Sequence, residues 1–244
     1  MFVFHLFEFH HKVTQFSFKS FSKTGGIQPC RTICANDYFH ILKELVIFVN
    51  YKGIDMNKLL LIIDPQIDFI TGSLIVPGAE QAMNALADYI TENEALYSGI
   101  VVTLDWHPLN HSSFIRFGGQ WPAHCVAHSV GAAVWQPLID SFTNINDKIV
   151  FLEKGTSPDK EEYSIFANHR SSEKLVSLVS ELSIERIDLC GLAGDVCVAN
   201  TLSDGVSLLG HRIWHILPSF TPSIDGGKTL TELIKTLNVT CDPS

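Results

Sequence analysis

Short aliphatic runs alternate with longer amphipathic stretches from Met56 to the end of the chain. Five of the runs are rich in Val, Ile and Leu and are followed by polar or glycine-containing turns, which is typical of buried strands. They are residues 58–63, 100–104, 148–152, 186–190 and 212–216. The pattern therefore predicts five strands separated by long connections.

Apolar residues recur three or four positions apart in the connections, as they do in helices that bury one face. The clearest of these stretches are residues 82–90, 175–182, 198–209 and 230–237. Strands that alternate with helices predict an α/β fold, with a mostly parallel central sheet and helices on both faces. We expect one three-layer, doubly wound domain of the Rossmann-like kind.

The composition supports a folded globular chain and excludes several classes of function. Of the 244 residues, 46% are hydrophobic and 18% are charged. The longest apolar runs, 45–49 and 59–63, are far shorter than the roughly 18 residues that a membrane span needs. The net charge of −9 leaves no basic surface for nucleic acid. Six cysteines are too few for a disulfide scaffold, so we expect a reducing compartment, the cytoplasm.

The first 55 residues differ from the rest in composition and in periodicity. They hold nine of the sixteen phenylalanines and keep no helical or strand period for long. Their start is a poor signal peptide, because Glu8 and several histidines interrupt its apolar part. Cys30 and Cys34 alone are weak evidence for a metal site. We expect residues 1–55 to be a poorly ordered extension or an upstream translation product, Met56 to be the true start, and residues 56–244 to be the functional domain.

Reactive side chains follow the predicted strands. In an open parallel sheet the ligand lies beyond the carboxyl ends of the strands. Asp64 and Lys154 follow two of them, and a third runs into the segment 191–197, which ends at Cys197. If Asp195 caps the next helix, Cys197 lies in its first turn, where the helix dipole and Lys154 would lower the thiol pKa. Asp64 would then accept the thiol proton. Taken singly, the three residues also fit a helix-cap acid, a loop lysine and a small core residue.

A second group combines one carboxylate with two imidazoles. Asp105 and His107 are two positions apart on an extended segment, so their side chains point the same way, and His124 returns from the following loop. Such a set binds a divalent cation, and zinc, iron and manganese all accept it. Zinc is the expected ion. His111 fits equally as a fourth ligand or as a loop histidine.

These motifs resemble the nicotinamidases and pyrazinamidases of the isochorismatase-like cysteine hydrolases. The resemblance extends from about Lys58 to Ile216. It rests on five segments, Asp64-Pro65-Gln66-Ile67-Asp68-Phe69, Asp105-Trp106-His107-Pro108, Trp121-Pro122-Ala123-His124-Cys125, Lys154-Gly155 and Gly191-Leu192-Ala193-Gly194-Asp195-Val196-Cys197-Val198. In this family the metal-binding segments separate nicotinamidases from isochorismatases and carbamoyl hydrolases.

The resemblance implies an isochorismatase-like fold and hydrolysis of nicotinamide, or of pyrazinamide, to the acid and ammonia in NAD salvage. By position, it implies a catalytic triad of Asp64, Lys154 and Cys197 and the metal ligands Asp105, His107 and His124. It implies pyridine-binding walls at Phe69 and Trp121, with Tyr163 closing the pocket. It also implies a cis peptide before Ala193, with the Ala193 and Cys197 amides binding the oxyanion.

Other functions stay open at this point. The chain fits another amide hydrolase of the same superfamily, or a hydrolase in which the metal activates water and Cys197 is structural. A pyridine- or metal-binding protein without activity is the non-enzymatic alternative. Self-association also stays open, because helices that flank an open sheet commonly offer contacts between subunits.

Overall fold

The structure, a computed structural model, describes residues 56–243. Their core is a sheet with the strand order β3-β2-β1-β4-β5-β6, and every pair of neighbouring strands is parallel. The strands are β1 (Lys58–Ile63), β2 (Tyr97–Asp105), β3 (Ile149–Lys154), β4 (Arg186–Gly191), β5 (Trp214–Ile216) and β6 (Thr240–Cys241). The predicted α/β class with a parallel central sheet is confirmed.

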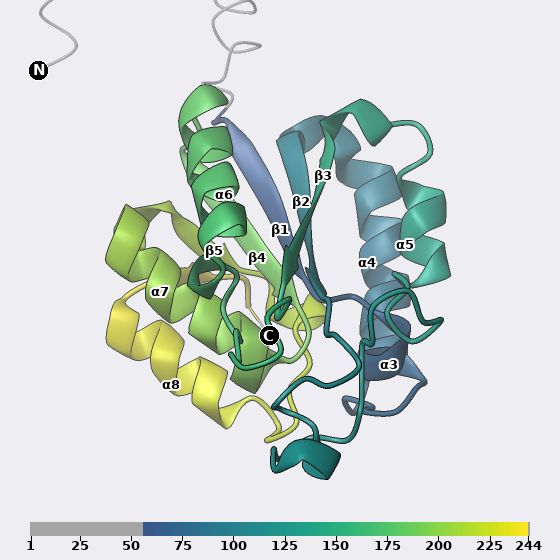
Figure 1. Cartoon of the computed structure of the whole chain (residues 1–244). Helices are drawn as coiled ribbons and strands as arrows, with labels where there is room; N and C mark the ends of the chain where they lie inside the picture. The colour runs from purple at the N-terminus through teal and green to yellow at the C-terminus, as the bar shows by residue number, and fades with distance from the viewer. Residues whose placement is uncertain (1–55, 244) are drawn as a thin grey trace, which may run out of the picture. The chain divides into compact units, whose positions relative to one another are not determined.

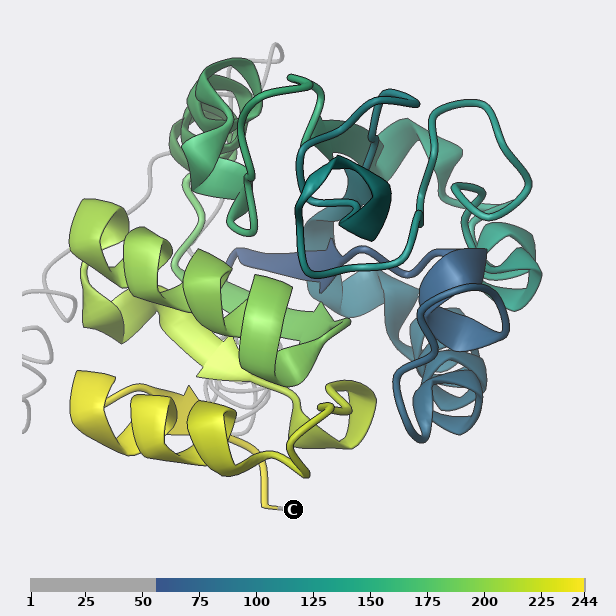
Figure 2. The same ribbon diagram turned by 60° about the horizontal axis from the view of Figure 1, so that its bottom comes forward.

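Helices cover both faces of this sheet (Figure 1). The short helix α3 (Ile67–Ile70), α4 (Ala79–Asn93) and α5 (Gln136–Ser141) lie on one side. On the other side lie α6 (His169–Glu181), α7 (Ala199–Leu209) and α8 (Lys228–Leu237), the last two side by side (Figure 2).

The alternation of side chains along β1 explains the three layers. Leu60 and Ile62 join the core under α4 and α5, whereas Leu59, Leu61 and Ile63 join the core under α6, α7 and α8. Successive side chains of a strand point to opposite faces, so a strand buried on both faces must be apolar throughout. This is why the central strand is the most uniformly aliphatic segment of the sequence.

Most predicted elements are present, with different ends. Strand β1 has the predicted bounds, and β2 begins earlier, at Tyr97. Strand β5 is shorter than predicted, because residues 211–213 form a 3-10 turn. The elements α3, α5 and β6 were not predicted, since they are too short to show a period.

The order of the strands positions the functional site. Strand β1 lies between β2 and β4, where the order of connection reverses, and ligands bind beyond the carboxyl ends of strands at such a point. No helix within residues 56–243 combines the length and the apolar character needed to cross a membrane. The expectations for residues 1–55, including Cys30 and Cys34, lie outside the described residues.

Candidate active site

Asp64, Lys154 and Cys197 meet beyond the carboxyl ends of the strands. Asp64 follows β1, Lys154 ends β3, and Cys197 lies in a π-helical turn, Gly194–Val198, between β4 and α7. The Lys154 ammonium is 2.7 Å from Oδ2 of Asp64 and 3.5 Å from Sγ of Cys197. All three side chains are buried. The structure thus brings together a thiol, a carboxylate and an ammonium from three separate strand ends.

Backbone and side-chain contacts fix the carboxylate of Asp64. The Thr103 hydroxyl donates to Oδ1 at 2.6 Å, and the Asp64 amide donates back to that hydroxyl at 3.1 Å. Asp64 has a positive φ of 46°, a left-handed conformation that aspartate tolerates better than most residues. A carboxylate oxygen of Asp64 lies within 4.8 Å of Sγ of Cys197. It is therefore near enough to exchange a proton with the thiol after a small movement.

Burial and the neighbouring charges perturb every group of this trio. Burial raises the pKa of Asp64 above its usual value, although Lys154 opposes the shift. Burial also lowers the pKa of Lys154, but the charges of Asp105 and Asp64 outweigh it and raise that pKa well above the usual range, so Lys154 stays charged. The pKa of the Cys197 thiol is raised by burial, against the effect of Lys154.

Two expectations about Cys197 need correction. A lowered thiol pKa was expected, but desolvation outweighs the ammonium, because the sulfur is buried and the charges of Asp64 and Asp105 add to the effect of burial. Asp195 does not cap the helix that follows. Its carboxylate instead accepts hydrogen bonds from the amides of Ile224 and Asp225, and Ala193 is the residue before the π-helical turn.

Asp105, His107 and His124 also come together, and Asp105 contacts the same ammonium as Asp64. Oδ2 of Asp105 is 3.2 Å from Nε2 of His107 and 3.6 Å from Nε2 of His124, while Oδ1 is 2.6 Å from the Lys154 ammonium. All three residues are buried. The charge of Lys154 and the two imidazoles outweigh burial and lower the pKa of Asp105 well below its usual value.

The hydrogen bonds of the two imidazoles fit a metal ion. Nδ1 of His107 lies 3.0 Å from the carbonyl oxygen of Gly155, and Nδ1 of His124 lies 2.8 Å from that of Pro122. A carbonyl oxygen only accepts, so each Nδ1 carries a hydrogen, and Nε2 is the ring nitrogen left to bind a cation beside Asp105. Nε2 of His107 is buried without a hydrogen-bond partner among residues 56–243. Acceptor atoms of these three residues lie within 4.8 Å of one another, which suits a divalent cation.

His111 is held by other groups. Its Nδ1 is 2.7 Å from the Ser113 hydroxyl, and its Nε2 is 3.1 Å from the carbonyl oxygen of Lys160. The ring stacks on His107 with 4.0 Å between the centroids. Both nitrogens are engaged within the protein, so this arrangement favours the loop-histidine interpretation over a fourth ligand.

The peptide between Leu192 and Ala193 is cis, as the resemblance implied. The amide of Ala193 makes no hydrogen bond within residues 56–243. The carbonyl oxygen of Ala193 already accepts from Val196 and Val198, and the Cys197 amide does not bond to it. The amide of Ala193 is therefore a candidate for binding an oxyanion, beside the Cys197 amide that the resemblance implies.

A narrow cavity of about 30 Å³ is lined by Cys197 of the first group and by Asp105 and His124 of the second. Phe69, Trp121 and Tyr163 all line it, together with Cys197 and His124. The Tyr163 hydroxyl accepts hydrogen bonds from Nε1 of Trp121 at 3.0 Å and from Gln120 at 2.8 Å, which ties the two loops over the cavity to each other. The cavity is also lined by Leu74, Val76, Asp105, Glu161, Ala193, Val196 and Ile224.

Sequence reasoning missed Gln66, which holds the carboxyl end of β2 in place. The side chain of Gln66 is fully buried. Its Oε1 accepts from the backbone amide of Asp105 at 2.8 Å, and its Nε2 donates to the backbone carbonyl oxygen of Asp105 at 2.8 Å. It thus fixes the backbone of a metal-type residue by a pair of bonds. Its position in the motif that follows the buried strand β1 could have indicated this role, because a buried glutamine side chain needs hydrogen-bond partners.

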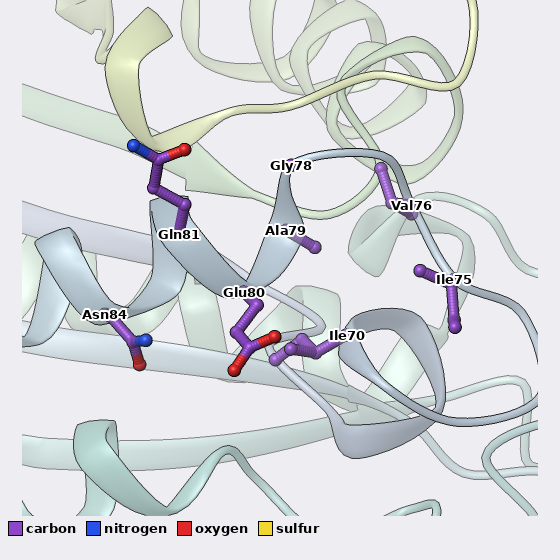
Figure 3. A pocket seen from close by; sticks show the side chains of 8 residues that line it. All are labelled: Ile70, Ile75, Val76, Gly78, Ala79, Glu80, Gln81 and Asn84. Atoms are coloured by element: carbon purple, nitrogen blue, oxygen red, sulfur yellow. The ribbon is translucent and has the colours of Figure 1, made fainter.

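A second hollow, of about 530 Å³, lies away from these groups, between the α3–α4 loop and the start of α4 (Figure 3). Among the residues that line it, Glu80 is the only one with a charged side chain. It offers no nucleophile and no metal-type set, so the chemistry of the molecule belongs to the narrow cavity.

Comparisons with known proteins identify the family and support the fold. The family model described as "Isochorismatase domain" matches residues 58–216. The nicotinamidase of Saccharomyces cerevisiae is 27% identical over 204 residues, which cover 72% of this chain and 93% of that protein. The pyrazinamidase of Pyrococcus horikoshii, solved in complex with zinc, is 28% identical with a TM-score of 0.64, covering 77% of this chain and 99% of that one. The protein PnC1 of L. infantum, solved in complex with nicotinate, is 30% identical with a TM-score of 0.64, covering 77% and 93%.

Proposed function

The chain belongs to the isochorismatase domain family, and we propose that it is a nicotinamidase, an amidohydrolase that converts nicotinamide to nicotinate and ammonia and also accepts pyrazinamide. The observation that carries this proposal is the position of the Lys154 ammonium, within 3.5 Å of Cys197 and within 2.7 Å of both Asp64 and Asp105. The nucleophile Cys197 and the proposed metal ligands Asp105 and His124 line one cavity together with aromatic side chains, and the ammonium joins Asp64 to them.

Cys197 acts as the nucleophile in this proposal. Asp64 takes the thiol proton, and the raised pKa of its carboxyl makes it a stronger base than a solvated aspartate. The sulfur attacks the carboxamide carbon while Lys154 compensates the negative charge. The proton on Asp64 passes to the leaving amine, which departs as ammonia. Water then attacks the thioester with Asp64 as base, and nicotinate leaves.

The oxyanion formed in both attacks is bound by the amides of Ala193 and Cys197. Donors of this kind typically contribute about 10²–10³ in rate, because they are aimed at the charge before it develops. Phe69 and Trp121 line the cavity beside the thiol and hold the flat ring, and Tyr163 ties the Trp121 loop down over it. The aromatic side chains thus fix the position of the pyridine ring, whereas the Ala193 and Cys197 amides fix the position of the substrate's carbonyl oxygen.

Asp105, His107 and His124 hold a divalent metal ion, for which we propose zinc, with iron and manganese as alternatives that the same donors accept. When bound, the ion supplies a Lewis acid that holds the pyridine nitrogen. The buried lone pair of His107 and the carboxylate of Asp105 are the groups of this chain that retain it. In this proposal Asp105 and His107 hold the ion so that the carboxamide of the substrate faces the sulfur, and the ion does not serve to activate water.

The test is ammonia release from nicotinamide by purified protein, before and after chelation and metal restoration. We expect release that chelation abolishes and metal restores. Cys197→Ser is expected to abolish release while the metal content stays at the wild-type level. Wild-type protein that releases no ammonia would overturn the proposal in favour of a pyridine- or metal-binding protein. A Cys197→Ser variant with near-normal turnover would favour metal-activated water, and a panel of other amides tests the neighbouring subfamilies.

Residues 56–244 are the hydrolase domain in this proposal, and the location is the cytoplasm, where a nucleophilic cysteine stays reduced. A chain that starts at Met56 is expected to keep full activity.

A further inference from the structure

Glu162 is a buried carboxylate that the proposed mechanism does not use. It is 4% exposed and lies in the loop between β3 and α6. Its Oε2 accepts from the Gly155 amide and from Nδ2 of Asn168, both at 2.9 Å, and its Oε1 accepts from the Lys160 ammonium at 2.9 Å. All three neighbours donate hydrogen bonds, so Glu162 uses both of its carboxylate oxygens as acceptors to satisfy them.

The Gly155 peptide connects Glu162 to the metal ligand His107. Gly155 offers its amide to Glu162 and its carbonyl oxygen to Nδ1 of His107, at 3.0 Å. The residue has a positive φ of 65°, and a Cβ there would lie 2.4 Å from Cε1 of His107. The peptide therefore packs directly against the imidazole, and its position sets both the direction of Nε2 and the tautomer of the ring.

The same loop also contacts His111, whose ring stacks on His107. The carbonyl oxygen of Lys160 lies 3.1 Å from Nε2 of His111, and the His111 ring stacks on His107. The Lys160 ammonium is bound to Glu162 at one side and to the carbonyl oxygen of Ala167 at 2.6 Å on the other. Glu162 thus bonds the Gly155 amide and the Lys160 side chain, and the backbone carbonyl oxygen of each of these two residues contacts one of the stacked imidazoles.

We propose that Glu162 is a positioning residue for the metal site, acting through the Gly155 peptide on His107. The inference rests on the proposed function only in that Asp105, His107 and His124 bind the cation. A hydrogen-bond partner behind a ligating imidazole typically changes metal affinity by about 10–100-fold when it is lost. Here that partner is a peptide held by a carboxylate.

The test compares Glu162→Gln with Glu153→Gln, which removes the same charge from an exposed side chain of β3 two residues before Gly155. Glutamine has one acceptor oxygen, so its amide group must face at least one of the three donors. Zinc affinity, measured by competition with a chelator, is expected to fall about 10–100-fold in Glu162→Gln and to stay within the error of wild type in Glu153→Gln.

A second measurement separates positioning from a general loss of stability. In metal-free protein, the His107 imidazole is expected to show a slowly exchanging proton on Nδ1 by ¹⁵N-resolved NMR, and Glu162→Gln is expected to lose that protection while the other amide signals of the sheet persist. Should Glu162→Gln not fold, the NMR and affinity measurements move to Glu162→Asp, which keeps both oxygens but shortens the reach.

Wild-type zinc affinity in a folded Glu162 variant, or an unchanged His107 signal, would overturn this inference while leaving the proposed function intact. Wild-type protein that binds no metal would instead overturn the proposed metal site itself. The two failures are therefore distinguishable.

Discussion

Replacing Lys154 by methionine tests the charge balance of the site. The ammonium is fully buried and lies 2.7 Å from a carboxylate oxygen of Asp64 and 2.6 Å from one of Asp105. Methionine fills a similar volume without the charge, so the substitution leaves two buried carboxylates that face each other. Removing one partner of a buried ion pair typically costs about 3–5 kcal/mol of unfolding free energy.

The expected loss is therefore about 3–5 kcal/mol for metal-free Lys154→Met. Proton uptake by Asp64, whose pKa burial already raises, moves the cost toward the lower end of that range. In a domain of this size each kcal/mol lowers the melting temperature by about 2–4 °C, so the melting temperature is expected to fall by roughly 6–20 °C. Ammonia release is expected to be lost even at temperatures where the variant is folded.

The assay is urea unfolding of wild type, Lys154→Met, Asp64→Asn and the double variant. Because Asp64→Asn removes one uncompensated carboxylate, the double variant is expected to be more stable than Lys154→Met alone, with a coupling of about 0.5–3 kcal/mol. Lys174→Met, at an exposed position of α6, is the control and should change little. Strictly additive losses, or a Lys154→Met variant as stable as wild type, would refute the reasoning.

Two further predictions concern stability. Gly205→Ala in α7 places a Cβ 2.2 Å from Cζ2 of Trp214. This overpacking is expected to lower the free energy of unfolding in urea by about 1–3 kcal/mol and to leave the turnover per folded molecule unchanged. A Gly205→Ala variant as stable as wild type would contradict the close packing of α7 on Trp214. The pKa of Glu162 is lowered by its hydrogen bonds and by Lys160 against the effect of burial. Glu162 therefore stabilises the fold above its unfolded pKa, and this stabilisation is lost as the pH falls through its folded pKa. The difference in unfolding free energy between wild type and Glu162→Gln should accordingly shrink in acid. A difference that stays constant with pH would contradict this.

The sequence predicted the parts of the molecule that depend on local pattern. Strand β1 is apolar because both of its faces are buried, and Asp64 comes directly after it, so the strand and the reactive residue were found together. Lys154 and Cys197 were found by the same rule, which needs only the ends of strands and the geometry of an open sheet. Asp105 and His107 were paired by the two-residue period of an extended chain.

Properties that depend on distant residues were not predicted. The thiol pKa of Cys197 was expected to be low because a helix terminus and a lysine were visible in the sequence, whereas its burial and the added effect of the Asp64 and Asp105 charges were not. Asp195 resembled a helix cap, but it bonds to amides about 30 residues further along the chain. Glu162 gave no signal, since its partners are set by the folded path of its loop.

Lys154 explains why two separate sets of motifs make one site. Asp105 gives Oδ1 to the ammonium and turns Oδ2 toward the imidazoles, so the metal-type residues and the thiol share one positive charge. Burial raises the pKa of both carboxyl groups, and the charge of Lys154 opposes this effect at each of them. Since Asp105 enters both halves, we expect its replacement by asparagine to weaken the proposed cation binding and also to change the electric field at the sulfur. In the proposed mechanism, the reactivity of Cys197 and the binding of the cation are therefore linked through the Asp105 side chain.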